Sequence, residues 1–287
     1  MNEPDSSLSN VDQEEGRRVF WSLYVIDRLT PCGRGRSESI ADNGCRLQLP
    51  CDEESFRNGA CRKTPTFKEL FSVVDSTRDR PCYLALGVFT AYIFGRCAKH
   101  SVYEYTKGES QLPPWDSKSE FAAIYSVLLQ FENQYELGSG VGQVLRRDCL
   151  QYGKIDMQLA GPVIFSHAVF RTSQCLLHHP YLLYQQCKVR GFKAPQSFLN
   201  RALQTCRENA CAMSELLQQI REAGYIAFMS FIGYCTTVAG SVHTMYLHHA
   251  DSSIRQQALE CLQINTLFLE EYSRYWKSGP KMVRNSC

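Results

Sequence analysis

The sequence has no two cysteines at C-x-x-C spacing, although it contains 14 cysteines. Zinc knuckles and binuclear zinc clusters need such close pairs to wrap a metal ion from one turn of the chain. The N-terminus also lacks a basic segment followed by an apolar one, so an oxidising compartment is not indicated. We therefore interpret the cysteines as reduced and mostly buried thiols, and we assign no metal ligand to them.

An excess of charge of either sign is also missing. The chain has 31 basic and 29 acidic residues, which give a formal net charge of +2. Proteins that hold nucleic acid by a broad surface usually carry a strongly basic face. We therefore do not expect this chain to bind DNA directly.

Catalytic motifs are absent as well. No histidine pair has the spacing of a zinc protease or a di-iron bundle, and no G-x-S-x-G elbow occurs. The glycine-rich run GSGVG at 138–142 follows a predicted helix rather than a strand, and no Gly-Lys-Ser or Gly-Lys-Thr follows it. It is therefore interpreted as a connector between helices, not a phosphate loop. We assign no catalytic residue and no cofactor, and an enzymatic role is not favoured.

The longest apolar run, residues 223–247, is long enough to cross a bilayer. Polar residues crowd its second half and no basic cluster flanks it, so we interpret it as a buried helix and expect no membrane partner. Such polar residues inside apolar helices could line a ligand pocket, and His167, Thr237, Ser241 and His243 are the pocket candidates. The alternative is that they form hydrogen bonds within helices or across helix contacts.

Helical periodicity dominates the chain, and runs of alternating Val, Ile and Thr are absent. The fold class is therefore all-α, an irregular multi-helix bundle of about seven or eight helices. Residues 1–13 are expected to be disordered, 14–276 to form a single helical regulatory domain, and 277–287 to be a C-terminal tail. The expected helical stretches have approximate bounds of 14–29, 67–104 with a break or restart at Pro81, 121–135, 157–187, 196–222, 223–248 and 252–276.

The segment RRVFWSLYVIDR, residues 17–28, is apolar on nearly every face of a helix. Such a helix is usually buried on several sides, and Asp27 would then need a charged or hydrogen-bonding partner. Asp27 with Arg17, Arg18 and Arg28 forms either an anion site or a structural ion-pair network. We favour the network, because no ligand is indicated and removing one partner of a buried pair is costly.

Residues 17–56 resemble the signature of the fungal-specific transcription factor domain, the middle homology region of fungal zinc-cluster regulators. Five short motifs follow one another in the family's order: paired arginines, an aromatic residue with Trp, Asp-Arg, Gly-Arg and Leu-Pro. The residues assigned to this signature, with a structural role, are Arg17, Arg18, Trp21, Asp27, Arg28, Gly35, Arg36 and Pro50. Residues 165–183 and 231–249 are similar to later family helices, so the likeness covers most of the chain from about residue 14.

The sequence departs from the family pattern at Ser37, where proline is usual, and at His179, where arginine is frequent. The C-x2-C-x6-C spacing of the family's zinc cluster does not occur either, so no DNA-binding residue is assigned. The resemblance implies an all-helical regulatory domain without its DNA-binding part.

From this resemblance we expect a fungal transcriptional regulatory protein in the nucleus, or in nucleus and cytoplasm, that controls a specialised-metabolite gene cluster. It would act through protein partners, a zinc-cluster DNA-binding regulator among them, or through a small-molecule effector. One alternative is a regulatory fold repurposed as a small-molecule-binding protein or biosynthetic enzyme. Another is a truncated gene product.

Overall fold

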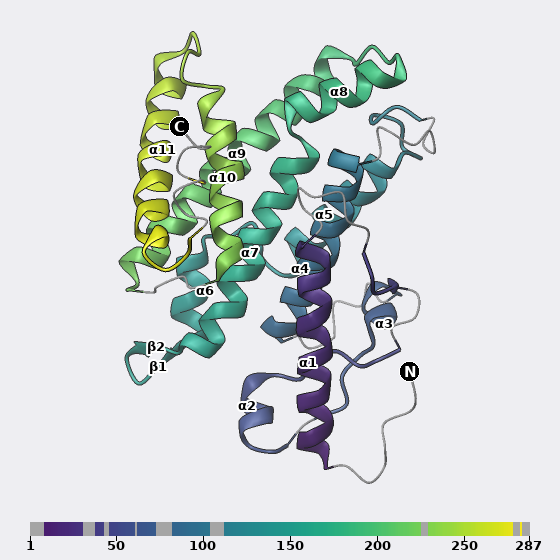
Figure 1. The fold of residues 1–287 in the computed structure, drawn as a ribbon, viewed down its shortest axis with the longest axis vertical. Coiled ribbons are helices and arrows are strands. Elements are labelled where there is room, and N and C mark those ends of the chain that lie inside the picture. The colour runs from purple at the N-terminus through teal and green to yellow at the C-terminus, as the bar shows by residue number, and fades with distance from the viewer. Residues whose placement is uncertain are drawn as a thin grey trace. The chain divides into compact units, whose positions relative to one another are not determined.

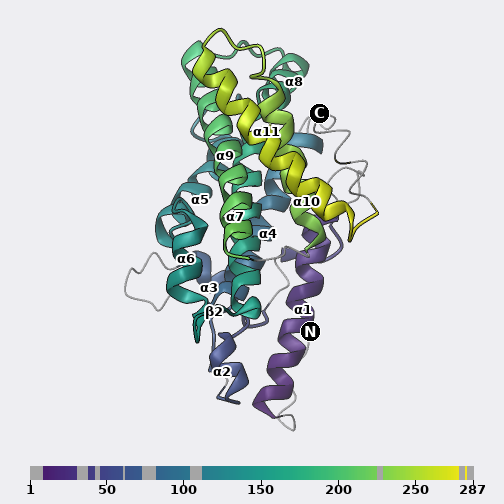
Figure 2. The ribbon, with the colours of Figure 1, turned by 90° about the vertical axis from the view of Figure 1, so that its left-hand side faces the viewer.

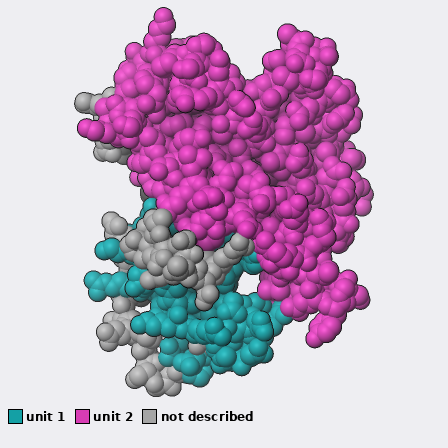
Figure 3. All heavy atoms as spheres, turned by 180° about the vertical axis from the view of Figure 1, so that it is seen from behind, with its two compact units in different colours: residues 1–95 teal, residues 96–287 magenta. Residues whose placement is uncertain are grey.

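The computed structural model describes residues 9–30, 38–42, 46–60, 62–72, 82–103, 112–224, 229–277 and 282. The chain forms two compact units, residues 1–95 and 96–287 (Figure 3). The disordered segment, single helical domain and tail expected at 1–13, 14–276 and 277–287 stay predictions.

The first unit is built around helix α1 (Asn10–Leu29). Ser9 caps this helix with a capping box, in which its side chain accepts from the Asp12 amide and Asp12 accepts from the Ser9 amide. The helix therefore begins before Glu14, where the apolar periodicity had placed its start. The other helices of this unit are α2 (Glu53–Arg57), α3 (Phe67–Ser72) and α4 (Tyr83–Ala98), which continues into the second unit.

Aromatic side chains from three of these helices form the core of the first unit. Phe67 of α3 lies at its centre, with its ring centroid 5.7 Å from that of Trp21 and 5.9 Å from that of Tyr24. The rings of Phe89 and Tyr92 on α4 lie 5.8 and 5.0 Å from Phe67. Edge-to-face and tilted aromatic pairs of this kind stabilise a core beyond their buried area.

The regular elements described in the second unit are helices and one short hairpin. It contains the π-helix η2 (Lys99–Tyr103), α5 (Glu120–Gln134), α6 (Val141–Asp148), β1 (Leu150–Gln151), β2 (Lys154–Ile155), α7 (Met157–Leu177), α8 (Pro180–Arg190), α9 (Gln196–Glu222), α10 (Ser230–Thr244) and α11 (Ser252–Ser273). The all-α class is confirmed.

Helix α7 is the core helix of the second unit. Every residue from Val163 to Leu177 except Phe165 is buried. It packs against α9 and α10, and α10 in turn packs against α9 and α11 (Figures 1 and 2). A helix that is buried on nearly all faces has no amphipathic stripe, which is why its sequence alone does not show which neighbours it contacts.

Two expectations about this unit were wrong. Residues 157–187 do not form one helix, because Pro180 lacks an amide N–H and takes the first position of α8, and the preceding His179 is extended. The antiparallel β1–β2 hairpin was also not expected. Its loop residues Tyr152 and Gly153 both have positive φ, and its strands are too short to show an alternating pattern.

The three C-terminal helices agree better with their sequence patterns. Helix α9 has the predicted bounds 196–222, and α11 begins at the predicted residue 252 with Asp251 as its cap. Helix α10 is shorter than the predicted 223–248, and Gly224 with φ +70° follows the end of α9. Among the described residues, no helix has the combination of length and hydropathy needed to span a bilayer.

Candidate functional site

The signature residues of α1 surround a buried carboxylate, Glu14, whose side chain has no solvent exposure. One carboxylate oxygen lies 2.8 Å from Nε of Arg17. The other accepts hydrogen bonds from Nε of Arg18 at 3.1 Å and from the amide of Cys51 at 2.9 Å. Glu14 therefore pairs with two arginines and links α1 to the segment that precedes α2.

Both arginines reach further partners on that segment. Arg17 donates to Oε1 of Gln48 at 2.6 Å, and Arg18 forms a 2.7 Å ion pair with Glu53. The Arg18 guanidinium also lies 3.9 Å from the ring centroid of Phe56 on α2. Burial lowers the pKa of Arg18, but hydrogen bonds to Glu53 and Glu14 outweigh it, so its pKa is raised. Both arginines are thus paired with fixed protein groups.

Arg28, at the other end of α1, is the centre of a second group of charges. Its side chain is 1% exposed and lies 3.0 Å from Asp27, 3.3 Å from Glu38 and 2.8 Å from Asp42. Its guanidinium stacks 4.3 Å from the ring centroid of Tyr24. Three carboxylates thus balance one buried cation, which leaves this group with negative rather than positive character.

Asp27 has a backbone role besides its ion pair. Its carboxylate accepts the amide N–H groups of Ser39 and Ile40, each at 3.0 Å. Burial raises the pKa of Asp27, but these hydrogen bonds outweigh it and hold the pKa below its ordinary value. Burial, together with a 2.6 Å hydrogen bond donated to Asp42, raises the pKa of the Tyr24 hydroxyl. We name Glu14, Arg17, Arg18, Asp27 and Arg28 the α1 network.

The four other signature residues lie outside the α1 network. Trp21 is buried and donates its indole N–H to the carbonyl of Gln48 at 2.8 Å. Pro50 is buried, and its carbonyl accepts the Cys82 thiol at 3.1 Å. Gly35 and Arg36 lie outside the described residues.

The sequence analysis did not identify two residues that shape the surroundings of the signature arginines, Glu14 and Gly95. Glu14 stands three and four residues before Arg17 and Arg18, which is the spacing of ion pairs on one helix face, so a search of α1 for such pairs would have found it. Gly95 of α4 was missed too. A Cβ at this position would lie 3.1 Å from Cδ of Arg28, so a glycine leaves room for the arginine. No sequence signal marks that contact.

The four pocket candidates lie in the second unit and are not gathered in one place. Thr237 and Ser241 donate to carbonyls of their own helix α10, those of Gly233 at 2.9 Å and Val238 at 2.7 Å. His167 is buried in α7, where burial and the nearby Arg171 lower its pKa to about 4. An imidazole with this pKa is neutral at physiological pH.

His243, the fourth candidate, lies in a buried polar cluster. Its ligand nitrogen and the sulfurs of Cys211 and Cys261 all lie within 4.8 Å of one another. Ser214 contacts His243 Nε2 at 3.1 Å and donates to Oδ1 of Asn265 at 2.8 Å. We name Cys211, His243 and Cys261 the Cys–His cluster. The sequence assigned no metal ligand, because local spacing does not show side chains that converge from α9, α10 and α11.

Two open clefts lie in the second unit. One, of about 740 Å³, lies between α6, the β1–β2 hairpin and the end of α9, and the other, of about 510 Å³, lies between α9 and α11. None of the four pocket candidates lines either cleft. The glycine-rich run 138–142 joins α5 to α6, and the Gly142 amide donates to Gln219 at 2.8 Å, so that N–H is occupied by the protein itself.

The cysteines agree with their interpretation as buried thiols. All ten that the structure describes are free, and nine of them are buried. Burial raises the pKa of Cys235 to about 12 and that of Cys82 to about 11, so these two thiols stay protonated at neutral pH.

Residues 1–79 match the family model for the fungal specific transcription factor domain. Beyond that domain, the chain is similar to curated regulators. It is 22% identical over 292 residues to the Zn(2)-C6 fungal-type transcription factor FTF1c of Fusarium oxysporum f. sp. lycopersici, covering 98% of this chain and 30% of that protein. It is 26% identical over 245 residues to the Asperfuranone cluster transcription factor afoA of Emericella nidulans, covering 85% of this chain and 31% of that protein.

The chain thus spans less than a third of the length of the curated relatives it matches. No solved structure matches it. The resemblance carried by the α1 motifs is confirmed: residues 1–79 match the fungal specific transcription factor domain, and 98% of the chain is similar to a Zn(2)-C6 fungal-type transcription factor.

Proposed function

We propose that this chain is a regulatory module of fungal transcription that works in the nucleus through protein partners. The observation that carries the proposal is the similarity over 98% of the chain to a Zn(2)-C6 fungal-type transcription factor, together with the family domain at residues 1–79. The relative named for the asperfuranone cluster supports a specialised-metabolite gene cluster as the target.

In this proposal a zinc-cluster partner makes the contact with DNA. The formal net charge of +2 gives little electrostatic attraction for a phosphate backbone, whose neutralisation needs clustered Lys and Arg. The arginines of α1 do not supply such a cluster, because Glu14 and the carboxylates around Arg28 already pair with them.

We assign the α1 network a structural role. Its contacts run from α1 to Ser39, Ile40, Asp42, Gln48 and Glu53, which all lie on the chain that follows the helix. An added anion would have to displace a protein carboxylate from each guanidinium. The network would thus fix the shape of the surface that a partner meets, without itself being a ligand site.

Deletion of the gene tests the regulatory proposal. Transcripts of the neighbouring genes and the metabolite profile should be measured in the same cultures, with re-expression of the intact chain as the control. Transcripts and product that change together, and recover on re-expression, support a regulator. Steady transcripts with accumulation of a late intermediate would instead support the alternative that the fold serves as an enzyme.

A second experiment addresses DNA contact. The purified chain should be mixed with promoter fragments of the affected genes, alone and with the zinc-cluster protein recovered with it from nuclear extract. Retardation only in the presence of the partner is expected. Tight and sequence-specific retardation by the chain alone contradicts indirect contact. The small-molecule alternative stays a prediction. Its four candidate residues line neither of the two clefts.

A further inference from the structure

The Cys–His cluster brings two thiols and an imidazole together in the interior of the second unit. Cys211 comes from α9, His243 from α10 and Cys261 from α11, and their ligand atoms all lie within 4.8 Å of one another. His243 is 1% exposed and each cysteine 8% exposed. The cluster is therefore shielded from bulk water, although each cysteine residue keeps a small exposed fraction.

The chemical identity of these three groups selects a particular class of ligand. Thiolate and imidazole are the ligands that Zn²⁺ prefers, and tetrahedral sites with Cys and His ligands are common for this ion. With Zn–S near 2.3 Å, two tetrahedral sulfurs would be about 3.8 Å apart. The two sulfurs lie within 4.8 Å of each other, so they would have to approach by at most about 1 Å. Side-chain rotation on the packed helices can supply this movement.

A second observation at the same place points to a missing ligand. Asn265 has no solvent exposure, and its amide Nδ2 has no hydrogen-bond partner among the described residues. Its Oδ1 accepts from Ser214, which also contacts Nε2 of His243. A buried polar N–H without an acceptor is costly, and metal-bound sulfur is an acceptor for such donors.

Ser214 and Asn265 lie one helical turn from the two cysteines of the cluster. Ser214 lies three residues after Cys211 on α9, and Asn265 lies four residues after Cys261 on α11, so each supports a cysteine of its own helix face. Outer partners of this kind orient a ligating imidazole and tune its basicity.

We propose that Cys211, His243 and Cys261 form a zinc site that ties α9, α10 and α11 together. The two thiols each lose a proton when Zn²⁺ binds, so the +2 charge is balanced by two thiolates and two protons are released to solvent. A water molecule completes the tetrahedron. This inference does not depend on the proposed regulatory function.

The test uses the full chain, stripped of metal and kept reduced, and titrates it with Co²⁺ alone. One equivalent should produce the visible bands of tetrahedral Co²⁺ and the near-ultraviolet sulfur-to-cobalt charge-transfer band, and added Zn²⁺ should bleach both. Cys211→Ser and Cys261→Ser should lose the charge-transfer band. Ser214→Ala should weaken Co²⁺ binding by about tenfold.

The chain offers a matched control in another buried cysteine pair. Cys175 of α7 and Cys206 of α9 each direct a thiol to the other's carbonyl, at 3.7 and 3.6 Å. No histidine in the described part of the chain completes this pair as a metal-ligand group. Cys175→Ser and Cys206→Ser should leave the Co²⁺ spectrum unchanged. Because a cluster variant could fail to fold, His243→Cys is a second probe: it replaces one ligand by another and should keep one equivalent of Co²⁺ with a stronger charge-transfer band.

Far-ultraviolet circular dichroism should accompany each titration, so that loss of the fold is distinguished from loss of the site. The proposal is overturned if the folded chain gives no tetrahedral Co²⁺ spectrum. It is also overturned if the spectrum survives in the two cluster serine variants, or disappears in the Cys175 and Cys206 variants while their fold is retained.

Discussion

Replacement of Glu14 by alanine should destabilise the first unit more than any other single change to a charge at the N-terminal half of α1. The substitution removes the partner of two arginines and the acceptor of the Cys51 amide at once. Loss of one partner from a buried ion pair costs roughly 3–5 kcal/mol. Arg17 and Arg18 keep 11% and 18% side-chain exposure and retain Gln48 and Glu53. We therefore expect a smaller loss, about 2–3 kcal/mol.

Trp21 makes this loss measurable within the first unit. It is one of three tryptophans in the chain, and the other two, Trp115 and Trp276, belong to the second unit. In a background with Trp115→Phe and Trp276→Phe, fluorescence follows only the buried indole beside Gln48. A loss of 2–3 kcal/mol should lower the urea midpoint by about 1 M, since the urea dependence is typically about 1–3 kcal/mol per molar.

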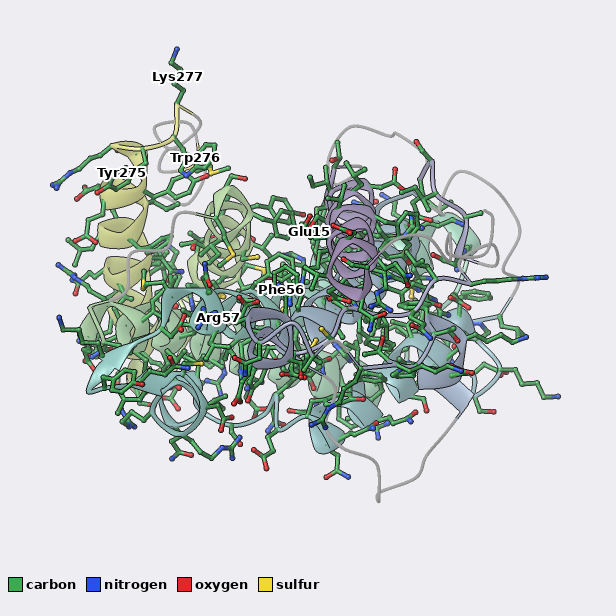
Figure 4. All side chains as sticks on the ribbon, turned by 90° about the horizontal axis from the view of Figure 1, so that it is seen from below. Glu15, Phe56, Arg57, Tyr275, Trp276 and Lys277 are labelled. Carbon is green, nitrogen blue, oxygen red and sulfur yellow. The ribbon has the colours of Figure 1, made fainter. Side chains whose placement is uncertain are left out.

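Glu15 is the matched control for Glu14. It has the same side chain and is the next residue of the same helix, but it is exposed (Figure 4). Glu15→Ala should change the free energy of unfolding by less than about 0.5 kcal/mol. If Glu14→Ala and Glu15→Ala differ by less than that amount, Glu14 does not fasten α1 and the argument from the buried network is refuted.

Four further substitutions follow from the structure. Because burial lowers the pKa of His167 to about 4, the folded protein keeps this imidazole neutral while the unfolded chain takes up a proton near pH 6.5. Stability should therefore fall by on the order of 3 kcal/mol between pH 6.5 and 4, and His167→Gln should remove that share in urea titrations at stepped pH. Gly233→Ala would place a Cβ 2.8 Å from the Tyr272 ring and should cost about 1–3 kcal/mol. A Cβ at Gly16 would have no atom within 4 Å, so Gly16→Ala should instead stabilise α1 by about 1 kcal/mol. Thermal melting measures the effects of both glycine substitutions. Arg28→Met should destabilise the first unit by about 3 kcal/mol in the Trp21 assay, because it leaves three carboxylates facing one another.

Each of these has a clear contrary result. Equal pH profiles for the intact chain and His167→Gln contradict a neutral buried histidine. Gly233→Ala and Gly16→Ala should have opposite signs, and a shift of the same sign in both contradicts the packing argument. An unchanged urea midpoint for Arg28→Met means that its ion pairs contribute no net stability.

The helical class of this chain could be predicted because its helices carry strong local signals. The apolar period between Gln196 and Glu222 gave the bounds of α9, and Asp251 is a good cap for α11. The break at Pro180 was also readable from sequence, since proline favours the first turn of a helix over its interior. The β1–β2 hairpin was not, because strands of two residues leave no alternation to detect.

The signature arginines and Asp27 were predicted to form an ion-pair network, but the centre of that network was not. Motif comparison directs attention to the residues that a family shares, and Glu14 precedes residues 17–56, the segment in which the signature was recognised. The Cys–His cluster could not be predicted for a different reason. Its side chains lie on three helices, and only the packing of α9, α10 and α11 brings them together.

The burial of α7 has a consequence for synthesis of the chain on the ribosome. Residues 163–177 find their main neighbours on α9 and α10, which end at Glu222 and Thr244, so the apolar surface of α7 is made well before the helices that cover it. At about 5–20 residues per second, the interval from Leu177 to Thr244 is roughly 3–13 s. During that time the nascent second unit exposes the apolar surface of α7 to solvent, and a chaperone that binds such segments would protect it from aggregation.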